Sequence, residues 1–176
     1  PALSPAGLHA GASRFHLHVA VGEAAEELHP RAAVHEQAPG LRLGFLLVGG
    51  LLGPVLLVDA TLKEHSGRAR PVRIEQFGGA KQFTPAFIPA DQCTANCSFV
   101  SGHVATAAFI MAFGWLGAPA VRRRWLLASI GFAAMLALAR MLPGGHFLSD
   151  TVFAWFATYF SLWLTEWIFR RLKWLP

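Results

Sequence analysis

The sequence predicts an all-α fold, a polytopic bundle of four transmembrane helices, and three observations support this prediction. Apolar residues make up 54% of the 176 residues and charged residues only 14%, whereas soluble domains are about a quarter charged. Fourteen Phe and six Trp accompany a single Tyr, a bias that suits membrane cores and their interfaces. The apolar segments also lack the regular polar stripe that a soluble four-helix bundle would need.

The four predicted helices are long enough to cross a hydrocarbon core of about 30 Å. They cover residues 43–60, 103–118, 125–142 and 148–169. Glycines and prolines inside them would weaken soluble helices, but they are tolerated in bilayers. We therefore interpret all four segments as membrane spans.

Basic residues in the short connections predict the orientation of the bundle. Arg42 precedes the first helix, three arginines at 122–124 join the second to the third, and the RRLK stretch at 170–173 follows the fourth. The positive-inside rule places this side in the cytoplasm. The long segment 61–102 then lies on the outer face of the inner or plasma membrane, which is the periplasmic face in a Gram-negative bacterium.

The composition divides the chain into two parts, residues 1–40 and residues 41–176. The first part holds five of the eight histidines and has no apolar run that could cross a bilayer or resemble a signal peptide. We expect it to be disordered or foreign to the fold, and the irregular histidine spacing argues against a metal site. The second part is the predicted membrane domain. The net charge of +5 comes with no basic face, which excludes nucleic acid as a partner.

Cys93 and Cys97 are the only cysteines in the chain. Two thiolates could supply half of a zinc site, but no second pair exists to complete it. We expect either two buried thiols or, if this loop faces an oxidising compartment, a local disulfide.

Ionisable and small polar residues form clusters at the predicted outer face. Lys63 follows the first helix, and Arg70 precedes Pro71, which disfavours helical geometry at Arg70. Ser101 and Gly102 stand where the second helix begins. A helix start with free N–H groups and a glycine for close approach makes a site for an anion.

A third cluster lies between the last two helices. Arg140 closes one helix, while His146 and Asp150 open the next. Because they are four residues apart, these two side chains are expected to lie on the same helical face. The carboxylate can then orient the imidazole and leave its other nitrogen free as a nucleophile. The Pro-Gly-Gly break at 143–145 lets Arg140 and His146 converge.

Each of these residues alone has an ordinary explanation, since a cation at a helix end usually reaches for the interface and a lone histidine is usually structural. Together, on one face, they predict a phosphate site. Lys63, Arg70 and Arg140 would neutralise phosphate oxygens, and Ser101 with nearby backbone N–H groups would hold another.

These residues give the chain a clear resemblance to the membrane lipid phosphatase branch of the type 2 phosphatidic acid phosphatase superfamily. The family motifs are Lys-x6-Arg-Pro, Pro-Ser-Gly-His and Ser-Arg-x5-His-x3-Asp. Here the first is complete at 63–71, the second has Val100 in place of proline, and the third has Ala139 in place of serine. Both replacements remove scaffolding rather than reactive groups, and the resemblance covers residues 63–150.

The resemblance implies a role for each motif residue. His146 would attack phosphorus and form a phosphohistidine, Asp150 would orient it, and His103 would protonate the leaving oxygen and later activate water. The implied phosphate ligands are Lys63, Arg70, Ser101, Gly102 and Arg140. The resemblance also implies that no metal and no cofactor is needed, and that the partners are a lipid phosphate and the bilayer.

The resemblance leaves the substrate and two rival functions open. Phosphatidate, phosphatidylglycerol phosphate, undecaprenyl pyrophosphate and lipid A phosphates are all candidates, and we expect the segment 72–100 to set the choice. A phosphotransferase would use the same site with another acceptor. Members of the family usually have six helices, so a truncated, inactive lipid-binding protein is the second rival. The oligomeric state is not indicated.

Overall fold

The computed structural model describes residues 39–175. Their regular secondary structure is helical, and their only extended pairing is an isolated bridge between Ile74 and Lys81. The prediction of an all-α fold is therefore confirmed for this part of the chain. The predicted polar segment 1–40 lies outside the described residues except for its last two, which begin the first helix.

The first predicted helix is longer than expected. Helix α2 (Pro39–Gly50) continues directly into a π-helical stretch, η2 (Leu51–Lys63). Pro54 lies inside η2, where its missing N–H removes one backbone hydrogen bond without ending the helix. Lys63 is consequently the last residue of this helix rather than a residue beyond it.

The second helical region is short and central. It consists of α3 (Gly102–Ala108), a single 3-10 turn η5 (Phe109–Met111) and α4 (Ala112–Trp115). Most of α3 is buried, and it packs against η2, α5 and α6. Its small side chains allow these neighbouring helices to approach closely.

Helices α5 (Pro119–Met141) and α6 (Leu148–Arg171) complete the bundle. The prediction that the three arginines at 122–124 form a connecting loop is wrong, because they lie in the first turns of α5. Pro119 starts this helix, and proline is favoured at the first helical position because its missing N–H would have no partner there. The connection to α4 is reduced to residues 116–118.

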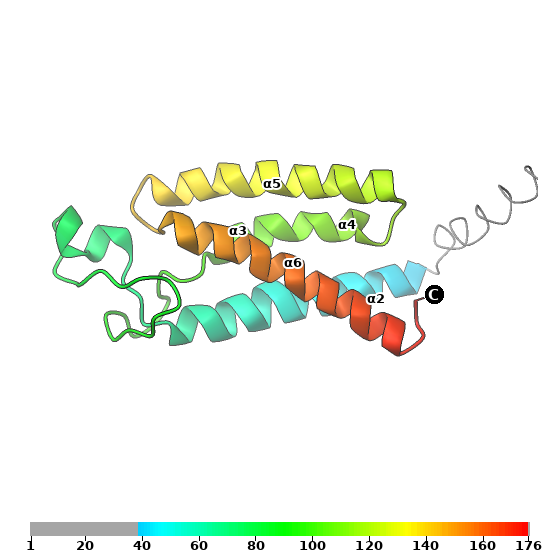
Figure 1. The fold of residues 1–176 in the computed structure, drawn as a ribbon, viewed down its shortest axis with the longest axis horizontal. Coiled ribbons are helices and arrows are strands. Elements are labelled where there is room, and N and C mark those ends of the chain that lie inside the picture. Colours follow the sequence, from blue (N-terminus) through cyan, green and yellow to red (C-terminus); the bar gives the residue numbers. More distant parts are fainter. Residues whose placement is uncertain (1–38, 176) are drawn as a thin grey trace, which may run out of the picture. The chain divides into compact units, whose positions relative to one another are not determined.

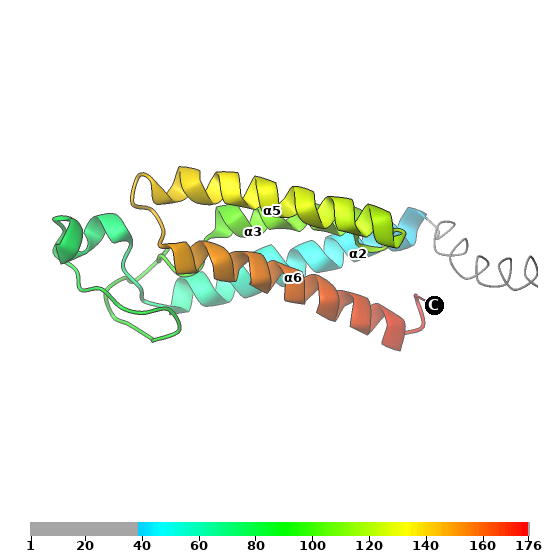
Figure 2. The same cartoon turned by 45° about the horizontal axis from the view of Figure 1, so that its top comes forward.

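Successive helical regions run in alternating directions, as Figures 1 and 2 show. The end of η2, the start of α3 and the turn between α5 and α6 therefore meet at one end of the bundle. The long segment 64–101 lies at the same end and contains two 3-10 turns, η3 (Pro71–Arg73) and η4 (Glu75–Phe77). The three sequence motifs are thus brought together by the topology.

Two of the four predicted spans have the length and hydropathy of membrane helices within residues 39–175. These are Pro39–Lys63 and Pro119–Met141, while the apolar region Gly102–Trp115 is shorter. Helix α6 has 24 residues, and it buries small polar side chains such as Thr158 and Ser161 while it exposes Phe160 and Trp163.

Candidate active site

Arg70 is held in the segment that follows η2. Its backbone is extended, with φ −77° and ψ 152°, as predicted for a residue before proline. Its Nη2 donates to the backbone oxygen and to Oδ1 of Asn96, each at 2.9 Å. Burial lowers the pKa of Arg70, and the nearby charges of Arg140 and Arg73 lower it further. Cations this close to each other favour the binding of an anion between them.

Three buried side-chain polar atoms at this end of the bundle have no hydrogen-bond partner among the described residues: Oγ1 of Thr84, Oγ of Ser101 and Nε of Arg140. Ser101 is fully buried at the N-cap position of α3, yet its Oγ forms no capping hydrogen bond. The Nε of Arg140 is likewise buried and without a partner. Buried polar groups are normally satisfied, so these atoms indicate that a polar ligand belongs here.

His146 does not lie on a helix, contrary to the prediction. Helix α6 begins two residues later, at Leu148, because Phe147 occupies the N-cap position. The Nδ1–H of His146 donates to the backbone carbonyl of Ser98 at 2.8 Å. The nearest oxygen of Asp150, Oδ2, is 3.8 Å from Nδ1, which is within ion-pair range but too far for a hydrogen bond.

Asp150 is fully buried and is engaged by other groups. Its Oδ2 accepts hydrogen bonds from the hydroxyl of Ser98 and, at 2.8 Å, from the N–H of Phe147. The same Ser98 whose carbonyl holds His146 therefore also donates to Asp150. Ser98 thus links the carboxylate to the histidine, whereas the direct hydrogen bond that the four-residue spacing predicted is not formed.

Arg68 contacts the candidate site residue Asp150, and the sequence analysis missed it. It is buried, and its Nη1 forms an ion pair with Oδ1 of Asp150. Its Nε donates to the carbonyl of Thr84 at 2.8 Å, and its guanidinium lies 4.2 Å from the ring centroid of Phe147. Its position between Lys63 and Arg70 in the first motif was the available signal.

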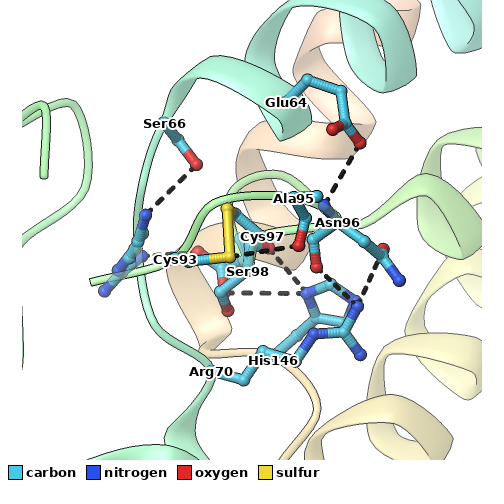
Figure 3. The surroundings of a disulfide bond; sticks show 11 residues. Glu64, Ser66, Arg70, Cys93, Ala95, Asn96, Cys97, Ser98 and His146 are labelled. Carbon is cyan, nitrogen blue, oxygen red and sulfur yellow. Dashed lines mark hydrogen bonds and ion pairs between the residues drawn. A yellow bond between two sulfur atoms is a disulfide. The ribbon is translucent and has the colours of Figure 1, made fainter. Parts of the chain in front are cut away.

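Cys93 and Cys97 form a disulfide, which decides between the two alternatives left by the sequence. Figure 3 shows the five-residue loop that the disulfide closes, beside Arg70 and His146. Asn96, which binds Arg70, lies inside this loop, and Ser98, which binds His146, follows it directly. The disulfide loop thus supports both residues.

The remaining predicted site residues lie at the same end of the bundle. Lys63 Nζ is 3.3 Å from Oδ1 of Asp59. Asp59 also faces the backbone of Gly102, where a Cβ would lie 2.6 Å from its Oδ1, so that a larger residue would clash. His103 follows on α3 and is exposed. It lies close enough to Arg140, Lys63 and His146 to interact with them electrostatically.

An open cavity of about 710 Å³ is lined by two of the predicted phosphate ligands, Arg70 and Arg140, whereas the described residues that line it include neither His103 nor His146. Its walls also include the disulfide loop and the turn between α5 and α6. The described residues contain no group of three His, Cys, Asp or Glu side chains that could hold a metal ion. Arg70 and Arg140 on the cavity wall are cations that can bind an anion.

Comparison of the chain with known protein families identifies one match. The sequence model of the PAP2 superfamily matches residues 42–174. Because this match covers most of the chain, the protein belongs to the PAP2 superfamily. No solved structure matches the chain.

Several curated relatives carry names that describe their reactions. The lipid A 4′-phosphatase of Francisella tularensis subsp. novicida is 40% identical over 132 residues, which is 73% of this chain and 59% of the relative. The lipid A 4′-phosphatase of Rhizobium etli is 41% identical over 70% of this chain and 47% of the relative. A lipid A 1-phosphatase of Rhizobium johnstonii is 37% identical over 65% of this chain and 43% of the relative. The chain thus spans about half the length of these relatives.

Proposed function

We propose that this protein is an integral membrane phosphatase that removes phosphate from a lipid headgroup through a phosphohistidine intermediate. The observation that carries the proposal is that the ring of His146 is held by a hydrogen bond while nearby polar atoms that could bind phosphate have no hydrogen-bond partner. His146 is fixed at Nδ1 by Ser98, which leaves Nε2 with its lone pair. The unpartnered Oγ of Ser101 and Nε of Arg140 belong to the same end of the bundle.

The proposed reaction has two steps. In the first, Nε2 of His146 attacks phosphorus, the bond between phosphorus and the lipid oxygen breaks, and His103 gives its proton to that oxygen. In the second, His103 takes a proton from water as the water attacks the phosphohistidine, and inorganic phosphate leaves. Lys63, Arg70 and Arg140, with Ser101 and the backbone at Gly102, would stabilise the charge on the transferring group.

For the substrate, we propose the 4′-phosphate of lipid A. Support comes from the names of the relatives, which are about 40% identical to this chain over 132 and 124 residues. Hydrolysis of the 1-phosphate of lipid A is the second candidate, because a relative of that name also matches. Other lipid phosphates and pyrophosphates use the same chemistry and belong in the test panel.

We also propose that all four helical regions lie in the membrane with the site at the outer, periplasmic face. Exposed large apolar side chains and buried small polar ones on α6 are the reverse of a soluble helix. The disulfide is typical of an oxidising compartment. The arginines at 122–124 lie at the other end, as expected for a cytoplasmic side.

Phosphate release by the purified protein in detergent tests the activity. The panel should contain lipid A, phosphatidate, phosphatidylglycerol phosphate and undecaprenyl pyrophosphate, with mass spectrometry of the lipid product. Free phosphate and lipid A that has lost its 4′-phosphate are expected. A phosphorylated acceptor lipid would instead identify a phosphotransferase, and no turnover of any lipid would support the inactive lipid-binding protein.

Two inhibitors examine the mechanism in the same assay. Vanadate should inhibit, because it mimics the five-coordinate phosphorus of the transition state. EDTA should leave the rate unchanged, and strong sensitivity to the chelator would favour a metal-dependent hydrolase instead.

A further inference from the structure

Four cations line the 710 Å³ cavity, and only two of them belong to the sequence motifs. Arg70 and Arg140 are the motif residues, whereas Arg73 and Lys81 come from the loop segment that follows the first motif. A cavity of this size is large enough to hold a whole small-molecule headgroup rather than a single phosphate. The two additional cations therefore need an explanation of their own.

Backbone hydrogen bonds hold Lys81 against residues 73–75, and the residue directly opposite Lys81 is Ile74. The N–H of Lys81 donates to the carbonyl of Arg73 at 2.9 Å, and the carbonyl of Lys81 accepts from Glu75 at the same distance. The chain reverses between them at Gly78, whose φ of +83° favours glycine. Gly79 then passes so close to the Arg73 carbonyl that a Cβ would lie 2.0 Å from the oxygen. The backbone hydrogen bonds and the two glycines thus define a tight turn.

The turn is docked on the part of the site that carries Arg140 and His146. Val72 donates its N–H to the carbonyl of Gly144 at 3.0 Å, in the connection between α5 and α6. Ile74 is buried and anchors the other side of the turn. Arg73 is thereby placed close enough to Arg70 to lower the pKa of that residue.

Within residues 39–175, no carboxylate forms an ion pair with any of the four cavity cations. Other cations at this end are paired, since Lys63 contacts Asp59 and Arg68 contacts Asp150. The carboxylate on the cavity wall is Asp91, and its Oδ1 accepts a hydrogen bond from Gln92. The positive charge of the four cations thus exceeds the summed negative charge of Asp91 and of one phosphate group.

We propose that Arg73 and Lys81 form a second anion subsite, which binds another phosphate on the headgroup of the same lipid. This inference rests on the proposed function, because Arg70 and Arg140 are taken to bind the phosphate that is cleaved. The subsite makes the protein selective for lipids with two phosphates. Neither residue contacts the reacting atoms, so their contribution lies in substrate binding.

The test compares lipid A that carries phosphates at both the 1 and 4′ positions with lipid A that carries only the 4′-phosphate. For the double variant Arg73→Gln/Lys81→Gln, we expect KM for the two-phosphate lipid to rise roughly tenfold, since two partly exposed ionic contacts are lost. The value of kcat should not change, and kcat/KM for the one-phosphate lipid should stay within about twofold of wild type. If wild type hydrolyses neither lipid, the proposed function fails before the subsite is tested.

Two controls separate the subsite from general charge effects and from folding. Arg123→Gln/Arg124→Gln removes the same charge from the start of α5 and should leave both KM values unchanged. Arg73→Lys/Lys81→Arg keeps the charge and should recover most of the selectivity. Equal losses on both lipids, or no loss on either, would overturn the proposal.

Inhibition by inorganic phosphate distinguishes the two anion sites. Free phosphate competes with the one-phosphate lipid at the site of cleavage, so its inhibition constant against that lipid should be the same for wild type and Arg73→Gln/Lys81→Gln. If this constant rises in step with KM, then Arg73 and Lys81 belong to the cleavage site and the second subsite does not exist.

Discussion

The backbone carbonyl of Ser98 accepts a hydrogen bond at 2.8 Å from Nδ1 of His146. Ser98 directly follows Cys97, which forms a disulfide with Cys93. Asn96, inside the disulfide loop, binds Arg70 through two oxygens. A small covalent loop therefore supports both the proposed nucleophile and a proposed phosphate ligand. Figure 3 shows these groups together.

Opening the disulfide is expected to impair catalysis more than folding. Freed from the loop, Ser98 and Asn96 would lose their fixed positions, and misplacement of a catalytic group by about 1 Å can lower the rate by about 100-fold. We expect dithiothreitol to lower kcat by about 10- to 100-fold. Cys93→Ser/Cys97→Ser should have the same low rate and no response to the reductant; a fully active double variant would show that the loop does not position His146.

The identity of the nucleophile is tested by His146→Ala. Removal of a nucleophile typically costs four or more orders of magnitude, so kcat should fall by about 10⁴-fold or more. An acid quench of wild type during turnover of a ³²P-labelled lipid should trap an acid-labile phosphoprotein, which the variant should lack. His65→Ala is the matched control, because His65 is exposed and its ring contacts the carbonyl of Thr61, four residues earlier in the chain. Equal activity of His146→Ala and wild type would refute the mechanism.

The ion pair between Arg68 and Asp150 should contribute to stability as well as to the site. Both side chains are almost completely buried, and removal of one partner from a buried pair typically costs about 3–5 kcal/mol because it leaves an unpaired charge. Arg68→Ala should therefore lower the melting temperature in detergent markedly. Arg68→Met/Asp150→Asn should recover part of this loss while it stays inactive. A double variant that is less stable than Arg68→Ala would contradict this account of the pair.

The sequence was sufficient to predict the helices and the meeting of the motifs, because both follow from simple regularities. Apolar segments mark the helices, two of which have the length and hydropathy of membrane spans among the described residues, and helices that alternate in direction bring the ends of the first and third to the start of the second and fourth. The three arginines at 122–124 were assigned to a loop because we interpreted a run of charged residues as the boundary of a membrane helix. Arginine is a good helix former, however, and Pro119 sets the true start of α5.

The contacts inside the site could not be read from spacing in the same way. A spacing of four residues predicts contact only if both residues are helical, and His146 precedes the helix that contains Asp150. Arg68 looks like any loop cation until the fold buries it against a residue 82 positions later. The contact of Arg68 with Asp150 depends on the tertiary fold, and so does the contact of His146 with the carbonyl of Ser98.

Ser101 offers a test of the phosphate site that separates binding from folding. Its buried Oγ has no hydrogen-bond partner among the described residues, so Ser101→Ala removes no internal contact and should leave the melting temperature unchanged or slightly higher. A hydrogen bond to a charged phosphate is worth about 1.5–3 kcal/mol, and kcat/KM should fall by about 10- to 100-fold. Thr158→Ala is the contrasting control, because the Thr158 hydroxyl bonds to the carbonyls of Ala105 and Ala154. It should lower stability and spare kcat/KM, and a stability loss in Ser101→Ala would argue against a ligand role.

The proposed acid role of His103 predicts an alkaline limb in the dependence of kcat/KM on pH. At high pH, loss of the proton from His103 removes the acid for the leaving oxygen. His103→Gln should therefore lose the alkaline limb and have a maximum that is lower by about 10²- to 10⁴-fold. A phosphate ester with a nitrophenolate leaving group needs no acid in the first step, so the variant should recover most of its kcat/KM on that substrate. An alkaline limb that persists in His103→Gln would assign the acid to another group.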